Sequence, residues 1–238
     1  MIKSLQDVEL YVILSPRSDI DYLKMAEQVI LGGADMVQFR VKDWMDKKTI
    51  EIGKKLREIT SNHKVPMVVN DRLDVAIALG ADGVHIGQQD MPLTLARRLL
   101  RWEAAGASIY ERDQKRRPEK GGAFFTGRSI TRFIGVSTHS LKQAVEAEKE
   151  GADYISIGPI FHTASKPDLK PIGLNPIRQA RKKVKMPFFA IGGIDHENVG
   201  DVIRAGAERV AVIHAVCSAK SVRKAAEEMK RRIKEAKG

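Results

Sequence analysis

The sequence contains a single cysteine, Cys217, among its 238 residues. One thiol cannot form an internal disulfide or build a cysteine-rich metal cage. Residues 1–7 lack the apolar core of a signal peptide, and no hydrophobic run approaches the length of a membrane span. We therefore expect a protein that works in the reducing cytoplasm and does not enter membranes.

The motifs of several enzyme classes are also missing. No glycine-rich dinucleotide fingerprint follows the first expected strand, and no Gly-x-Ser-x-Gly turn occurs. None of the six histidines forms a pair with the local spacing of zinc ligands. These absences argue against a doubly wound nucleotide-binding sheet, a nucleophilic triad and a zinc site.

Short apolar runs alternate with helix-like segments along the whole chain. The expected strands are 9–14, 34–40, 67–69, 83–86, 133–136, 154–157, 187–191 and 209–213. The expected helices are 20–31, 46–61, 74–79, 93–100, 141–150, 176–183, 196–205 and 221–236. Strict alternation predicts a parallel sheet. Eight such units within 238 residues predict an α/β fold, a closed (β/α)8 TIM barrel that forms a single domain over residues 1–238.

A glycine, a small residue and an acidic residue recur just before every second strand. The four copies end at Asp35, Asp82, Asp153 and Glu208. Glycine at a helix C-terminus adopts a left-handed conformation without penalty, and a short loop then leads into the next parallel strand. The repeat thus supports regular alternation of helices and strands.

The net charge of +11 comes largely from two segments. Residues 101–132 hold eight Lys or Arg against four Asp or Glu, and residues 218–238 hold eight against three. We interpret 102–132 as a basic insert between the fourth helix and the fifth strand. Such connections lie on the N-terminal face of a barrel, opposite the active site, so we do not expect the insert to be catalytic.

Polar residues that follow the expected strands are the candidates for chemistry, because active sites of this fold lie at the C-terminal ends of the strands. Gln38, Arg40 and Lys42 follow the second strand, and alternation places all three on one side of the extended chain. Two cations and an amide suit a polyphosphate.

Two carboxylates follow the next two strands. Asp71 lies in the segment Asn70-Asp71-Arg72 after the third strand, and Asp90 closes the segment after the fourth. Neighbouring parallel strands would bring both to one rim, and Mg²⁺ usually takes one or two carboxylates together with phosphate oxygens. Spacing alone leaves a second interpretation open, in which the two residues cap the helices that follow them.

The remaining strands supply further rim residues. Ser137, Thr138 and His139 follow the fifth strand, and the loop after the sixth carries Thr163, Ser165 and Lys166. Gly193 follows the seventh strand, while Ile213 and His214 are expected to end the eighth. Phosphate sites in this fold commonly use the loops after strands seven and eight. His85, inside the fourth strand, is instead expected to be a packed or hydrogen-bonded barrel residue.

Several of these motifs together resemble the thiamine phosphate synthase family. The matching segments are 38–42, 69–76, 80–92, 135–139, 158–161 and 190–194. They occur in the order typical of that family and span nearly the whole chain apart from the insert. The resemblance implies a TIM barrel that joins 4-amino-2-methyl-5-hydroxymethylpyrimidine pyrophosphate to 4-methyl-5-(2-phosphoethyl)thiazole, with release of pyrophosphate.

The resemblance also implies roles for individual residues. Asp71 and Asp90 would hold Mg²⁺ on the pyrophosphate. Arg40, Lys42, Asn70 and Lys166 would bind the pyrophosphate or stabilise its departure, with Gln38 and Ser137 near the pyrimidine and the leaving group. Thr163, Ser165 and Gly193 would hold the thiazole phosphate, and we expect Ile213 and His214 beside them. Among these, Arg40, Lys42, Ser137 and Lys166 are the predicted catalytic residues.

The sequence departs from the family pattern at a few positions. His162 stands where proline is common, Ser165 where threonine is common, and His214 where a serine usually helps to bind phosphate. These departures leave room for a thiazole tautomerase of the same barrel family, in which His139 would be the acid or base. The presence of Lys42 and Asp90 favours the synthase.

A non-enzymatic alternative is a basic barrel that binds RNA or a protein partner through the insert and the C-terminal tail. Nucleic-acid binding is not our expectation, because no aromatic cluster accompanies the basic residues. The expected partners are the two small-molecule substrates, and a homo-oligomer remains open.

Overall fold

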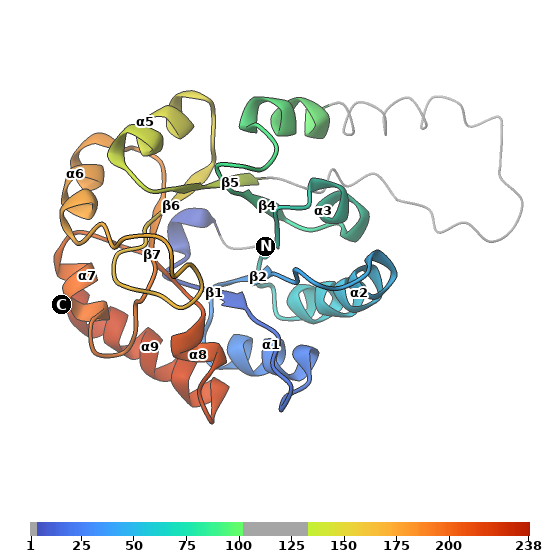
Figure 1. Cartoon of the computed structure of the whole chain (residues 1–238). Helices are drawn as coiled ribbons and strands as arrows, with labels where there is room; N and C mark the ends of the chain where they lie inside the picture. Colours follow the sequence, from blue (N-terminus) through green and yellow to red (C-terminus); the bar gives the residue numbers. More distant parts are fainter. Residues whose placement is uncertain (1–3, 102–132) are drawn as a thin grey trace, which may run out of the picture.

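In the computed structural model, which describes residues 4–101 and 133–238, eight parallel strands close into a barrel in chain order (Figure 1). The predicted α/β TIM barrel is confirmed. The strands are β1 Leu10–Leu14, β2 Met36–Phe39, β3 Met67–Asn70, β4 Gly83–Ile86, β5 Phe133–Thr138, β6 Tyr154–Ile157, β7 Phe188–Ile191 and β8 Val210–Val212. The insert predicted at 102–132 lies outside the described residues.

Helices follow the strands and surround the barrel (Figure 1). They are α1 Tyr22–Leu31, α2 Asp46–Asn62, α3 Leu73–Leu79, α5 Leu141–Lys149, α6 Asn175–Lys183, α7 Val199–Arg204, α8 His214–Cys217 and α9 Val222–Lys237, with a short 3-10 helix at Leu5–Asp7 and a further helix at 93–101. None of the helices in the described ranges has the length and apolar character needed to cross a membrane.

Several predicted boundaries differ from the observed ones by one to three residues, and two of the differences bear on the local geometry. The helix expected from residue 196 begins at Val199, because Asp195 Oδ1 accepts from the backbone N–H groups of Glu197 and Asn198 and forms a turn in place of the first helical turn. His214 does not end β8 but is the first residue of α8. The carbonyl of Ile213 already accepts from the N–H of Cys217 at 2.8 Å, so the chain turns helical one residue after the strand.

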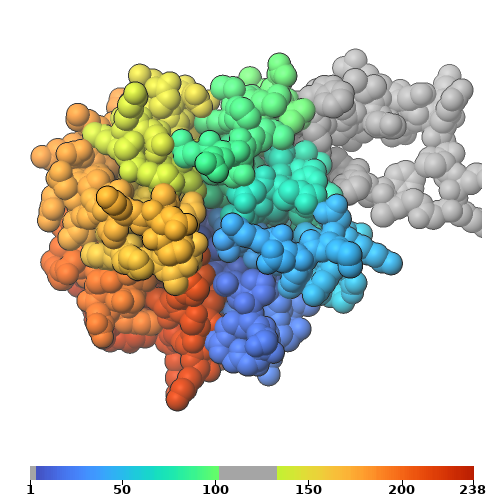
Figure 2. Space-filling view, viewed as in Figure 1, coloured from blue at the N-terminus to red at the C-terminus, as the bar shows by residue number. Residues whose placement is uncertain are grey.

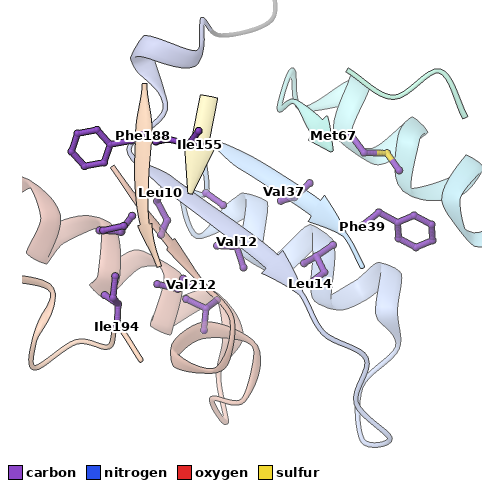
Figure 3. Packing of buried hydrophobic residues seen from close by; sticks show 14 of the residues in the cluster. Leu10, Val12, Leu14, Val37, Phe39, Met67, Ile155, Phe188, Ile194 and Val212 are labelled. Carbon is purple, nitrogen blue, oxygen red and sulfur yellow. The ribbon is translucent and has the colours of Figure 1, made fainter. Parts of the chain in front are cut away.

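Side chains of the strands alternate between two apolar layers. Leu10, Val12 and Val212 belong to the layer between the barrel and the helices, part of which is shown in Figure 3. Tyr11 and Ile13 belong to the layer that fills the barrel interior. This period of two is the pattern expected of strands in a closed barrel. Near the C-terminal ends of the strands the interior becomes polar, which leaves room for a site.

The repeated acidic residues tie the N-terminal ends of the strands to the helices. Asp82 accepts from the backbone N–H of Met67 at 2.9 Å and from Arg57 Nη1 at 2.7 Å. Asp35 makes the same kind of contacts, with the N–H of Leu10 and with Lys230. Asp153 does so with the N–H of Ile134 and with Arg97. Glu208 forms ion pairs with Arg181 and Arg209. Each of the three aspartates therefore joins two strands and a helix at the barrel end that lies opposite the predicted site, whereas Glu208 makes only ion pairs.

The first and last parts of the chain complete the ring. Strand β8 pairs with β1 in parallel, and the blue N-terminal and red C-terminal surfaces lie side by side in Figure 2. Because all eight strands are parallel, the loops that follow them lie at one end of the barrel.

Candidate active site

Every site residue predicted from the sequence lines one cavity at the C-terminal end of the barrel. Its volume is about 650 Å³, large enough for a drug-sized molecule. The predicted residues on its wall are Gln38, Arg40, Lys42, Asn70, Asp71, Asp90, Ser137, Thr163, Ser165, Lys166, Gly193, Ile213 and His214. The fold thus brings together side chains from loops that follow seven different strands.

The carboxylate of Asp71 is held by an unusual backbone conformation. Asp71 has a φ of 61°, a left-handed conformation that costs a residue with a side chain. Its N–H donates to the carbonyl of His85 at 2.8 Å, and Asn70 Nδ2 donates to Asp71 Oδ2 at 2.6 Å. These bonds orient the carboxylate at the end of β3.

The interpretation of Asp71 as a helix cap is not supported. The N-cap residue of α3 is Arg72, and that cap has no side-chain hydrogen bond. Asp90 turns back toward its own strand, where its Oδ2 accepts from the N–H of Gly87 at 2.6 Å. Both carboxylates therefore lie at the rim of the cavity, where the first interpretation of the sequence placed them.

The two carboxylates interact directly. The pKa of Asp71 is raised to about 6, first by burial and then by hydrogen bonding and charge repulsion from Asp90, while Lys42 and Arg40 act in the opposite direction. A bound cation would relieve the repulsion between the two acidic groups. Their all-oxygen donor set suits Mg²⁺.

Within the described ranges, no group of three or more His, Cys, Asp or Glu residues is arranged to hold a metal ion. Mg²⁺ commonly binds one or two carboxylates and completes its shell with water and substrate phosphates. Asp71 and Asp90 fit such an open site.

Gln38 lies deeper than the two cations that follow it. Its side chain is buried inside β2, and its Nε2 donates to the hydroxyl of Tyr11 at 2.5 Å. Lys42 is exposed and Arg40 half-buried at the rim. The three side chains therefore lie on one side of the extended segment, as predicted. The amide of Gln38 is at the floor of the cavity, and the two cations are at its mouth.

The wall formed by the last three strands carries hydroxyls and a histidine. Ser165 Oγ lies 3.0 Å from His214 Nε2, and His214 Nδ1 lies 3.1 Å from Ser218 Oγ. Gly193 has a φ of 64°, and a side chain there would come within 2.3 Å of the carbonyl oxygen of His162. The close approach of the two loops therefore requires glycine at this position.

Two further polar residues of the cavity were not assigned to the predicted synthase site, although His139 was considered as the acid or base of a tautomerase. Gln88 Nε2 donates to the carbonyl of Ser137 at 2.6 Å, and His139 Nδ1 lies 2.6 Å from the carbonyl of Gly158. Both follow strand ends, so the rule that identified Asp71 also applies to them. His85 contacts Ser137 from inside the barrel and could not be linked to it without the strand register.

A second cavity, at the N-terminal end of the barrel, is a weaker candidate. Its charged side chains are engaged with one another: Arg209 and Arg181 with Glu208, and Lys237 with Glu9. Such pairs leave little free charge for a ligand, whereas the C-terminal cavity combines Arg40, Lys42 and Lys166 with a carboxylate pair.

The fold and the site together define a class of protein. A (β/α)8 barrel that presents a carboxylate pair, cations and hydroxyls around a cavity at the C-terminal ends of its strands is an enzyme scaffold for phosphorylated substrates.

Comparisons with known proteins narrow this class to one family. A family model described as thiamine monophosphate synthase matches residues 10–131 and 127–216. Thiamine-phosphate synthase of Chloroflexus aurantiacus is 42% identical over 205 residues, which cover 86% of this chain and 82% of that protein. The protein of the same name from Pyrococcus abyssi is 36% identical and covers 98% of both chains.

A solved structure agrees with these sequence matches. The thiamine phosphate pyrophosphorylase of Pyrococcus furiosus superposes with a TM-score of 0.78 at 34% identity and covers 98% of this chain and 99% of that one. The chain therefore belongs to the thiamine monophosphate synthase family. The predictions of this family and of a transferase with thiamine-phosphate synthase activity are confirmed, and the matches give no support to the tautomerase or to the non-catalytic alternative.

Proposed function

We propose that this protein uses Mg²⁺ to join the pyrimidine pyrophosphate to the thiazole phosphate. The reaction takes place in the C-terminal cavity, forms thiamine phosphate and releases pyrophosphate. The observation that carries the proposal is the arrangement of the cavity wall. Carboxylates and cations follow β2, β3 and β4, and hydroxyls and a histidine follow β6 and β8 on the other side of the ring. Two anionic substrate ends can thus be held apart, with the reacting atoms between them.

The pyrophosphate belongs on the side of β2 to β4. Arg40 and Lys42 supply positive charge there, and both act on the charge of Asp71. Asn70 holds the Asp71 carboxylate and lines the same wall. Mg²⁺ bound by Asp71 and Asp90 would add positive charge next to the pyrophosphate oxygens.

Bond cleavage at the pyrimidine methylene needs stabilisation of a leaving anion. The carbon–oxygen bond breaks with its electrons on pyrophosphate, and the electron-rich aminopyrimidine stabilises the remaining cation. Lys166 and the Ser137 hydroxyl line the cavity where they can bind the leaving oxygens. The thiazole nitrogen then forms the new bond to carbon, and no proton has to be removed from either partner.

The thiazole phosphate belongs on the side of β6 to β8. Thr163 and Ser165 offer hydroxyl groups in the loop after β6, and the Ser165–His214 contact brings α8 to the same place. Gly193 and Ile213 line the wall with backbone groups. Holding both substrates in this geometry converts a bimolecular step into one within a single complex.

We also propose that the chain works in the cytoplasm, which is supported by its one thiol. Cys217 is free and buried, and burial raises its pKa to about 11, so the thiol is neutral and unreactive.

The metal-dependent part of the proposal is tested with Asp71→Asn and Asp90→Asn. Turnover of the purified chain on the two substrates should fall by at least about a hundredfold in each variant, because each loses a ligand to the ion that neutralises the leaving group. The fold should persist, as shown by circular dichroism. Full activity of either variant at low Mg²⁺ would contradict the proposed metal site.

A further inference from the structure

A chain of buried polar groups crosses the barrel interior and ends at Ser137. Tyr11 OH lies 3.3 Å from Tyr154 OH, and Tyr154 OH lies 3.0 Å from His85 Nδ1. On the other side of the imidazole ring, His85 Nε2 lies 3.0 Å from Ser137 Oγ. Gln38 Nε2 donates to Tyr11 OH at the far end. The proposed reaction uses Ser137 and Gln38 at the two ends of this series, and Tyr11, Tyr154 and His85 connect them.

A glycine in β5, Gly135, makes this series of hydrogen bonds possible. His85, Gly135 and Tyr154 are direct neighbours in the register of β4, β5 and β6. A Cβ atom on Gly135 would lie 2.0 Å from the ring of Tyr154. Glycine therefore lets the tyrosine ring cross β5 and reach the imidazole of His85.

The direction of the hydrogen bonds follows from the need to satisfy buried groups. Tyr11 OH is fully buried, and its partners in the described part of the chain are Gln38 Nε2, which only donates, and Tyr154 OH. The hydrogen of Tyr11 must therefore go to Tyr154. Tyr154 in turn donates to His85 Nδ1, which leaves the imidazole hydrogen on Nε2.

The hydrogen-bond pattern gives the imidazole of His85 one hydrogen, because Nδ1 accepts from Tyr154 and only Nε2 is left to carry it. The residue is 6% exposed. A neutral imidazole with its hydrogen on Nε2 donates one hydrogen bond toward the cavity, to Ser137 Oγ, with a longer contact of 3.4 Å to Ser156 Oγ.

We propose that His85 is a positioning residue that makes Ser137 an oriented hydrogen-bond donor to the anionic leaving group. His85 Nε2–H occupies an acceptor position of Ser137 Oγ, and Gln88 holds the carbonyl of the same serine. No other partner of Ser137 Oγ occurs in residues 4–101 and 133–238, so its hydrogen is left for the cavity. The inference rests on the proposed reaction for the identity of the acceptor, a phosphate oxygen, and no proton changes hands.

The position of the imidazole hydrogen can be measured without substrate. In the full-length protein labelled with ¹⁵N-histidine, the His85 signals are assigned by their loss in His85→Gln. We expect the chemical shifts of Nε2 bearing hydrogen and of Nδ1 without hydrogen at neutral pH. Tyr154→Phe removes the donor to Nδ1 and should move hydrogen toward that nitrogen. Hydrogen on Nδ1 in the wild type would overturn the proposal, whatever the enzyme turns over.

Kinetics test whether His85 acts through Ser137. The amide nitrogen of glutamine can occupy the place of Nε2, whereas the shorter asparagine cannot reach Ser137. His85→Asn should lower kcat about tenfold, the equivalent of one hydrogen bond in the transition state. His85→Gln should recover most of that loss, and the KM for the thiazole phosphate should stay unchanged in both.

A double-mutant cycle separates this role from general damage to the barrel. If His85 acts through the serine hydroxyl, His85→Asn combined with Ser137→Ala should be no slower than Ser137→Ala alone. Losses that multiply in the double variant, with native circular dichroism, would overturn the proposal. A wild type that makes no thiamine phosphate would refute the proposed function instead, and the NMR result would still decide the hydrogen position.

Discussion

Ser165 Oγ and His214 Nε2 lie 3.0 Å apart and join the loop after β6 to the first residue of α8. The contact links the two segments that we assign to the thiazole phosphate. His214 is held from both sides, because a second serine, Ser218, contacts the other ring nitrogen.

His214→Ala should raise the KM for the thiazole phosphate by about three- to tenfold, since one hydrogen bond to a charged group contributes roughly 1.5 kcal/mol. The KM for the pyrimidine pyrophosphate should stay nearly constant. Steady-state kinetics with one substrate saturating measure both values. His214→Ser, which restores the residue typical of the family, is the matched control and should recover the affinity. A larger change on the pyrimidine side would place His214 in the other half of the site.

Asp71→Asn should make the metal-free protein more stable at pH 7. The folded-state pKa of Asp71, about 6, exceeds the unfolded value of about 3.9, so the ionised carboxylate destabilises the fold above pH 6 and not below pH 4. Removing it should raise the free energy of unfolding by about 1 kcal/mol after allowance for solvent screening. Asparagine also tolerates the left-handed backbone at this position.

Urea unfolding with a metal chelator at pH 7 and pH 4 measures this effect. The gain should disappear at pH 4, and added Mg²⁺ should stabilise the wild type but not the variant. A variant that is less stable than the wild type at pH 7 would show that the ionised Asp71 carboxylate does not destabilise the metal-free fold.

Asp82→Ala should destabilise the barrel without impairing the chemistry. The substitution leaves Arg57 and the N–H of Met67 without their buried acceptor, which costs about 3 kcal/mol. Asp74→Ala breaks an exposed pair with Arg72 and should cost less than about 1 kcal/mol. Thermal unfolding compares the two variants, and similar losses would contradict the structural role of the repeated acid. The kcat of folded Asp82→Ala should equal that of the wild type.

Much of the site could be predicted because a parallel barrel turns chain order into position. Strand ends fall on one rim, so Asp71 and Asp90 could be placed together from two apolar runs alone. The repeated acids were noticed as a sequence pattern, but their bonds to the preceding strand were not expected. That contact depends on which strand start lies beside each acid.

Other features depend on geometry that local sequence does not encode. The series of hydrogen bonds from Tyr11 through Tyr154 to His85 can be predicted only if the register of β4, β5 and β6 is known. Its only signal in the local sequence is Gly135 within a strand. The left-handed conformation of Asp71 depends on its bond to the carbonyl of His85. The short helix α8, which begins at His214, was not predicted, because a run of apolar residues conceals the turn at Ile213.

The most direct test of the proposed reaction is the stoichiometry of its two products. Wild-type protein is incubated with both substrates and Mg²⁺, and thiamine phosphate and pyrophosphate are quantified over time. We predict equal amounts of both products, and neither when one substrate or the metal is withheld. Pyrophosphate without thiamine phosphate, or undiminished thiamine phosphate after removal of divalent metal, would contradict the account.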